Sequence, residues 1–138
     1  MEQKIFKEEH IIFRDSLRKF LDREIVPVYE QWEKEGIVPR SAWNKMGDNG
    51  FLCPWLEEKY GGVGADFVYS AIICEEMFYR GITRLVAPLH SDIIVPYIHN
   101  YGTEEQKMKW LPGCASGDIL TAIAMTEPNT GSDLSAIR

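Results

Sequence analysis

The sequence predicts an all-α fold as far as residue 117, followed by a single β-strand. Apolar residues recur at helical spacing from residue 5 to residue 32, and later helical stretches begin after typical N-cap residues. The pattern changes at residues 118–125, where "DILTAIAM" is short, apolar and partly β-branched. We therefore expect an all-α domain at residues 1–117 and the start of a β-domain at residues 118–138.

Length and composition indicate one globular domain without a basic face. The chain has 138 residues, of which 45% are hydrophobic and 26% are charged, enough for a single core. Its formal net charge is -6, and no cluster of Lys and Arg appears. Because nucleic-acid backbones are bound through basic surfaces, we expect no nucleic-acid partner.

The sequence also predicts a cytoplasmic protein with no membrane span. The opening "MEQKIFKEEHIIF" lacks the uninterrupted apolar core of a signal peptide, and no apolar run approaches the roughly 18 residues of a spanning helix. The three cysteines, Cys53, Cys74 and Cys114, are widely spaced and odd in number. This pattern favours buried thiols in a reducing compartment over disulfides or metal ligation.

The first half of the chain should form helices joined by short connectors. Residues 5–32 read as one long amphipathic helix or two in series, because Pro27 lacks an N–H and its ring clashes with the preceding turn. Residues 36–40 ("GIVPR") form a connector, and residues 41–50 a short helix that ends at glycine. The glycine-rich stretch 59–67 should be a loop.

The helix after this loop is predicted to begin at Asp66 as N-cap and to stop at Gly81. Residues 84–102 should be helical with interruptions at Pro88 and Pro96.

The last predicted helix begins with a capping box in "TEEQ". Thr103 can accept a hydrogen bond from the amide three residues on, while the side chain of Gln106 reaches back. This helix should stop at Pro112. A strand at residues 118–125 cannot satisfy its own backbone, so we expect its partner strands to lie outside this sequence.

None of the histidines or paired carboxylates forms a catalytic or metal-binding pattern. His10, His90 and His99 have no spacing that suits a metal, and are expected to be solvent-exposed or to lie at helix ends. Glu75 and Glu76 point about 100° apart on a helix, which favours a solvated face or a buried ion pair over an acid/base pair. We therefore assign no catalytic residue and no metal ligand.

Two loops contain glycine beside polar residues. Residues 61–64 ("GGVG") match neither the P-loop nor the dinucleotide pattern, which favours a structural loop. "TEPNTGSD" at residues 126–133 combines unpaired amides with the hydroxyls of Thr126, Thr130 and Ser132. Such a turn suits a flat heteroaromatic edge or a phosphate, with an ordinary capped turn as the alternative.

The stretch "AMTEPNTGSDL" resembles the signature of the acyl-CoA dehydrogenase family, T-E-P-x-x-G-S-D. The resemblance continues in "WNKMGDNGF", "KYGGVGADF" and "YGTEEQKMKWLPGCASGDI", so it covers essentially the whole chain, and it is greatest to the long-chain branch. It implies an N-terminal helical-bundle domain, a middle β-barrel domain that begins at residue 118, and a C-terminal four-helix domain. It also implies noncovalent FAD and a homotetramer.

The reaction implied by the resemblance is α,β-dehydrogenation of an acyl-CoA thioester. A glutamate takes the α-proton, the β-hydrogen leaves as hydride to flavin N5, and the electrons pass to an electron-transfer flavoprotein. The matching glutamate and a second flavin loop do not occur in this sequence, so we expect these 138 residues to be an N-terminal part that is inactive alone.

The resemblance assigns one segment to the cofactor. Thr126 would form hydrogen bonds near the pyrimidine edge of the flavin, and Ser132 would contact both FAD and the acyl-CoA substrate. Asn129 and Thr130 fill the variable positions of the signature. The assigned residues are Ile123, Ala124, Met125, Thr126, Glu127, Pro128, Asn129, Thr130, Gly131 and Ser132.

Three alternatives stay open at this point. The same scaffold could serve an acyl-CoA oxidase or a flavin monooxygenase, or it could be a helical binding module without catalysis.

Overall fold

The computed structural model describes residues 5–137, and their fold is all-α, as predicted. The helices are α1 (Glu8–Phe20), α2 (Val26–Glu35), α3 (Arg40–Asp48), α4 (Phe67–Tyr79), α5 (Val95–Tyr101) and α6 (Glu104–Ser116). Two π-helical segments, η1 (Leu21–Ile25) and η3 (Leu89–Ile94), and two short 3₁₀ segments, η2 (Glu58–Tyr60) and η4 (Leu134–Ala136), complete the order. Within residues 5–137, no helix is both long enough and apolar enough to cross a bilayer.

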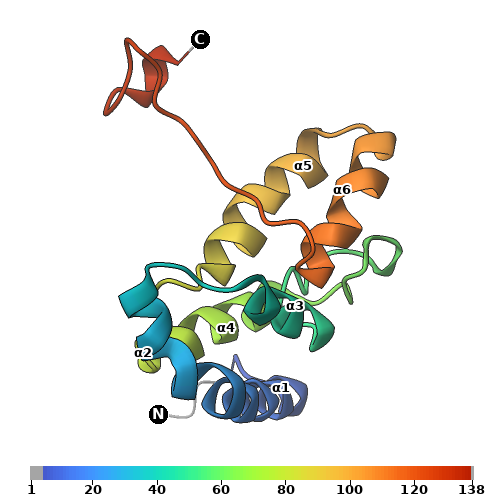
Figure 1. The fold of residues 1–138 in the computed structure, drawn as a ribbon. Coiled ribbons are helices and arrows are strands. Elements are labelled where there is room, and N and C mark those ends of the chain that lie inside the picture. Colours follow the sequence, from blue (N-terminus) through green and yellow to red (C-terminus); the bar gives the residue numbers. More distant parts are fainter. Residues whose placement is uncertain (1–4, 138) are drawn as a thin grey trace.

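The helices enclose one hydrophobic core. α1 packs against α4, α5 pairs with α6, and α3 lies against α6, as Figure 1 shows. Fully buried side chains from most of these elements meet in the core, among them Leu17, Met46, Ile72, Met77 and Leu111. The last residues leave the helical domain as an extended segment without secondary structure, which ends in a small turn (Figure 1).

A π-helical segment precedes a Val–Pro pair at both Pro27 and Pro96. The N–H of Val26 donates to the carbonyl of Leu21, and the N–H of Val95 donates to the carbonyl of His90. Each bond spans five residues, so the wide turn ends immediately before the proline, which then occupies the first turn of the next α-helix. The predicted helical stretch at residues 5–32, one helix or two in series, is therefore confirmed, and the interruption at Pro27 is a π-turn between α1 and α2.

The predicted caps are confirmed. Asp66 accepts a hydrogen bond from the amide of Val68 at 2.9 Å, and α4 stops before Gly81, whose φ is +68°. Gln106 accepts from the amide of Thr103 at 2.8 Å, while its own amide donates to the Thr103 hydroxyl at 3.3 Å.

The prediction that the last helix stops at Pro112 is wrong, because α6 continues through the proline to Ser116. Cys114 and Ala115 are buried beyond the proline, and this tertiary packing offsets the missing backbone bond. The helix ends instead at Gly117, where a Cβ would lie 2.5 Å from the carbonyl oxygen of Trp43 on α3. This close approach requires glycine.

The predicted strand at residues 118–125 is also wrong for this chain. Among residues 5–137 there is no strand, and the backbone groups of residues 122–126 have no hydrogen-bond partner there. A strand exists only against another strand, and the described residues offer none. The domain boundary at residue 117 stays a prediction.

A buried carboxylate joins α1 to α4. Glu76 on α4 is 1% exposed and accepts hydrogen bonds at 2.8 Å from both Arg18 and Arg80, with Arg14 3.7 Å away. Arg80 also binds Asp22 at 2.6 Å. Burial alone would raise the pKa of Glu76, but the hydrogen bonds from Arg18 and Arg80 outweigh it and hold that pKa below its usual range.

We predict that Glu76→Gln lowers the free energy of unfolding by about 3 kcal/mol at neutral pH, because it removes the buried anion that pairs with Arg18 and with the partly buried Arg80. The depressed pKa means that this stabilisation is present at neutral pH and is lost as pH falls through the folded-state value. Urea unfolding at a series of pH values should therefore show a smaller loss of stability towards acid in the variant. Glu75→Gln, at a half-exposed ion pair, is the control and should cost at most about 1 kcal/mol. Equal effects of the two substitutions would contradict the prediction.

We also predict that the chain self-associates through residues 122–126, since apolar side chains there accompany unpaired backbone groups. Ala124→Pro removes one donor from this row and should lower the apparent mass in analytical ultracentrifugation without changing the circular dichroism. Val63→Lys removes an exposed apolar side chain elsewhere and should leave the mass unchanged. An unaltered mass in the proline variant would count against the idea.

Candidate functional site

The turn that carries the predicted cofactor residues is a closed backbone unit. The amide of Glu127 donates to the carbonyl of Thr130 at 3.0 Å, and the amide of Thr130 donates back at 3.1 Å, so Pro128 and Asn129 form the tip. Segment η4 follows directly (Figure 1). The ten residues assigned to the cofactor thus lie on one extended segment and its turn.

Three hydroxyls on this unit have no hydrogen-bond partner among the described residues. Thr126 and Ser132 are exposed, and neither side chain has a hydrogen-bond partner among the described residues. The hydroxyl of Thr130 is buried and also lacks a partner there. A Cβ placed at Gly131 would meet nothing within 4 Å, so the backbone can be approached on that side. This donor set fits the polar edge of a flavin, while the assignment of residues 123–132 to FAD stays a prediction.

The start of the segment that leads to this turn, at Asp118 and Ile119, is held against the helices by polar contacts. Asp118 accepts hydrogen bonds at 2.8 Å from Asn44 through its side chain and from Arg40 through its carbonyl. The amide of Ile119 donates to the carbonyl of Gly113 at 2.9 Å. The segment is therefore anchored to α3 and α6 before its unpaired stretch begins.

His10 and His90 are each 1% exposed, so the prediction is wrong for His90, whereas His10 lies in the first turn of α1, at a helix end as predicted. His10 accepts a hydrogen bond from the amide of Lys7 at 3.1 Å and so caps α1, while the ring of Tyr69 packs edge-on against it. The burial of His10 and His90 depends on tertiary packing, which the spacing of residues in the sequence does not reveal. His99 does lie in the last turn of α5, where it pairs with Glu57 at 2.9 Å. No cluster that could hold a metal ion occurs within residues 5–137.

The cysteines are free thiols, and only two of them are fully buried. Burial raises the pKa of Cys53 to about 12 and that of Cys114 to about 11, so both are unreactive thiols at neutral pH. Cys74 is half-buried, which departs from the prediction, because it faces a groove.

That groove lies between α4 and η3 and has a volume of about 540 Å³. Its lining residues are Phe67, Ser70, Ala71, Cys74, Glu75, Pro88, Asp92 and Ile93. Asp92 accepts a hydrogen bond from the Ser70 hydroxyl at 2.7 Å, and burial raises the pKa of this carboxyl. Sequence reasoning missed the groove, although Phe67, Ala71 and Cys74 recur at helical spacing on one face of α4. The walls suit a slender apolar ligand.

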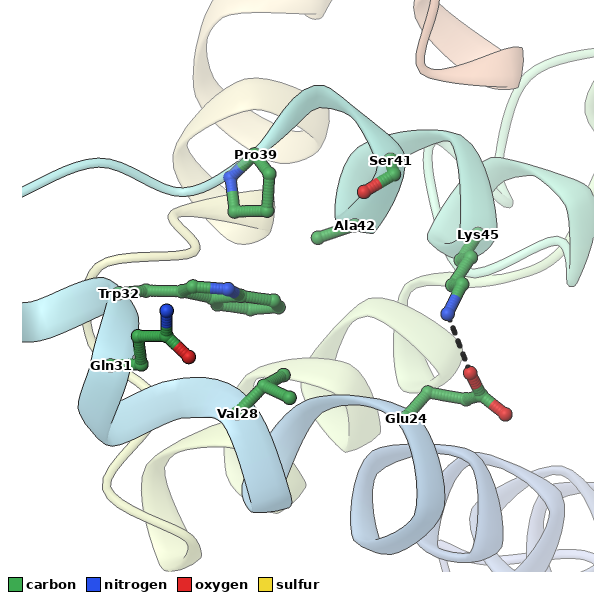
Figure 2. Close-up of a pocket in the computed structure, with 8 residues that line it drawn as sticks. All are labelled: Glu24, Val28, Gln31, Trp32, Pro39, Ser41, Ala42 and Lys45. Atoms are coloured by element: carbon green, nitrogen blue, oxygen red, sulfur yellow. Dashed lines mark hydrogen bonds and ion pairs between the residues drawn. The ribbon is translucent and has the colours of Figure 1, made fainter. Parts of the chain in front are cut away.

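A smaller cavity of about 260 Å³ lies between α2 and α3. Figure 2 shows Val28 and Pro39 on either side of the indole of Trp32. The ion pair of Lys45 with Glu24, 2.7 Å long, closes the other end. Because both charges already have partners, a charged ligand would have to break this ion pair, and the α4–η3 groove is the better candidate for a binding site.

Comparison with known proteins gives one consistent answer. A family model described as the acyl-CoA dehydrogenase N-terminal domain matches residues 7–118. The mitochondrial long-chain specific acyl-CoA dehydrogenase of Rattus norvegicus is 47% identical over 136 residues, which are 99% of this chain and 32% of that protein. An acyl-CoA dehydrogenase of Bacillus subtilis is 38% identical over 95% of this chain and 35% of its own length.

Solved structures agree. The crystal structure of an acyl-CoA dehydrogenase from Geobacillus kaustophilus superposes with a TM-score of 0.91 at 58% identity and covers 97% of this chain and 35% of its own. An acyl-CoA dehydrogenase from Bacillus anthracis complexed with FAD has a TM-score of 0.86 at 33% identity, over 98% of this chain and 23% of its own. The present chain therefore spans about a third of the length of the curated relatives that it matches.

Proposed function

The chain belongs to the acyl-CoA dehydrogenase family, and we propose that it serves as the N-terminal helical domain of a flavoprotein that α,β-dehydrogenates acyl-CoA thioesters. The observation that carries the proposal is the identity of 47% to a long-chain specific acyl-CoA dehydrogenase across 99% of this chain, turn included. The catalytic base would come from outside these residues, and electrons would pass to an electron-transfer flavoprotein. Assembly as a homotetramer and a cytoplasmic location belong to the same proposal.

The α4–η3 groove is the proposed site for part of the acyl chain. Phe67, Ala71 and Ile93 offer apolar walls, and no Lys or Arg lines the groove. Burying a hydrocarbon chain there would contribute about 0.8 kcal/mol per methylene group. The groove would thereby hold the chain out of water and leave the thioester end free to reach the cofactor.

The turn at residues 126–133 is the proposed contribution to FAD binding. FAD, when bound, supplies the oxidant of the reaction. The hydroxyls of Thr126 and Ser132 and the unpaired amides around them would donate to the polar edge of the flavin and favour negative charge there. Ser132 would also contact the acyl-CoA, and the buried, unpartnered hydroxyl of Thr130 would gain a partner from the ligand or from the turn as it closes on it.

A chimera tests the proposal directly. Residues 1–138 replace the matching third of the Geobacillus kaustophilus enzyme, to which this chain is 58% identical. We expect the purified chimera to hold FAD, seen in its visible absorbance, and to reduce an electron acceptor when an acyl-CoA is added. The isolated chain should do neither.

The unchanged parent enzyme is the control for folding and assembly. A chimera that holds FAD as the parent does but oxidises no saturated acyl-CoA, short or long, would overturn the proposed function. Turnover by the isolated chain would overturn the placement of the base outside it.

We further predict that Ala71→Trp in the chimera blocks the groove. Excluding two methylene groups corresponds to a loss of more than about tenfold in kcat/KM for a long acyl-CoA, with little loss for a short one. Tyr79→Trp, which adds an indole to an exposed position of α4 outside the groove, is the matched control. Equal losses for long and short substrates would contradict a role of the groove in holding the acyl chain.

A further inference from the structure

A buried histidine binds the chain at Thr121, just before the segment that is assigned to the cofactor (residues 123–132, the cofactor segment). His90 lies on η3, and its Nδ1 is 2.8 Å from the hydroxyl oxygen of Thr121 and 3.3 Å from the amide nitrogen of the same residue. Its Nε2 is 3.0 Å from the carbonyl oxygen of Cys114 on α6. We call these contacts of His90 with Thr121 and Cys114 the His90 latch.

The partners of the latch require one protonation state. The carbonyl of Cys114 can only accept, so Nε2 must carry a proton. The amide of Thr121 can only donate, so Nδ1 must be an acceptor without a proton. Both conditions describe the neutral Nε2–H imidazole, and burial, which lowers the pKa of His90, favours that neutral form.

The π-turn of η3 places the histidine where it can reach both partners. The carbonyl of His90 accepts the five-residue bond from Val95, and the neighbouring Ser91 is buried too. Ser91 accepts a hydrogen bond from the amide of Cys53 at 3.0 Å through its hydroxyl, and one from the indole of Trp55 at 2.9 Å through its carbonyl. The ring of Trp43 packs edge-on against the imidazole, with 5.7 Å between centroids. The imidazole is therefore held on a rigid support.

The latch holds the last anchored residue before the free stretch. Beyond Thr121, residues 122–126 make no backbone hydrogen bond among the described residues. Ile123, the first residue assigned to the cofactor, is two positions further on, and Thr126 follows after three more. At about 3.3 Å per residue, Thr126 lies roughly 16 Å beyond the latch. A small rotation of the backbone at Thr121 therefore displaces the turn several times further than it displaces the residues next to Thr121.

We propose that His90 is a positioning residue, which fixes the point and direction in which the cofactor segment leaves the helical domain. The inference rests on the proposed function only in assigning this segment to FAD. The latch itself is a property of the present chain and can be tested without any cofactor.

Two substitutions separate the two sides of the imidazole. His90→Asn keeps an acceptor oxygen near the position of Nδ1 and can still bind Thr121. His90→Gln keeps a donor near the position of Nε2 and can still bind Cys114, but loses the acceptor for Thr121. His99→Gln, at a histidine that pairs with Glu57 instead, controls for the general effect of losing an imidazole.

Amide hydrogen exchange of the isolated chain is the first measurement. We expect exchange at Thr121 to become at least about tenfold faster in His90→Gln, while α4 and α6 stay protected. His90→Asn and His99→Gln should stay close to the wild type. Unchanged exchange in His90→Gln, or equal acceleration in His90→Gln and His90→Asn, would overturn the latch.

The second measurement is the dissociation constant for FAD in the chimera described above. It should rise about tenfold with His90→Gln and remain near the wild-type value with His90→Asn. Equal FAD affinities in the two variants would overturn the positioning role. Failure of the proposed function is distinguishable, because it would appear in the chimera with the unsubstituted chain, as absent oxidation of acyl-CoA or as absent FAD binding, whereas failure of the latch appears in the exchange data.

Discussion

The carboxylate of Glu76 is the contact on which the packing of the N-terminal helices depends. It sits at the α1–α4 interface, where burial alone would disfavour a charge, and Arg18 on α1 and Arg80 at the C-terminal end of α4 donate hydrogen bonds to it at 2.8 Å. Arg80 carries the connection further to Asp22 in η1. A buried anion that is bound by arginines fixes a relative orientation of helices that apolar packing alone leaves looser. The core side chains of α1 and α4 meet in register because this network holds them there.

A second constraint acts where α3 and α6 approach each other. A Cβ at Gly47 would lie 2.1 Å from the carbonyl oxygen of Ser116, and one at Gly117 would lie 2.5 Å from that of Trp43. The backbones therefore touch at this point without intervening side chains. Directly beyond it, Asp118 and Thr121 are bound by α3 and by His90. The close contact between the backbones of α3 and α6 thus lies next to the residues that anchor the following segment, Asp118 and Thr121. This arrangement fixes the direction in which the segment leaves the helices.

The sequence predicts those features that depend on a few neighbouring residues. Asp66 as N-cap and Thr103 with Gln106 as capping box act within one turn, so spacing alone reveals them. The prediction that the last helix stops at Pro112 was wrong, because burial of Cys114 and Ala115 by distant helices outweighs the local cost of a proline. The prediction for His90 was wrong for the same reason, and the α4–η3 groove was missed because its walls come from two elements. The strand at residues 118–125 was predicted from side chains, whereas a strand is defined by a partner that the described residues do not include. The flavin-facing role of residues 123–132 depends on the resemblance and stays a prediction.

The π-turns before Pro27 and Pro96 also bear on how the length of this chain can change in evolution. A π-turn holds one residue more than an α-helix of the same rise, so it corresponds to a one-residue insertion that the helix has absorbed. Deleting one residue from Leu21–Ile25 would let that turn close as an ordinary α-helix, and all residues before it would rotate by about 100°. Leu17 and Phe20 would then leave the core, and the arginines of α1 would leave Glu76. The helical regions at these prolines should therefore keep their length even where their side chains vary, with insertions and deletions confined to the connecting loops.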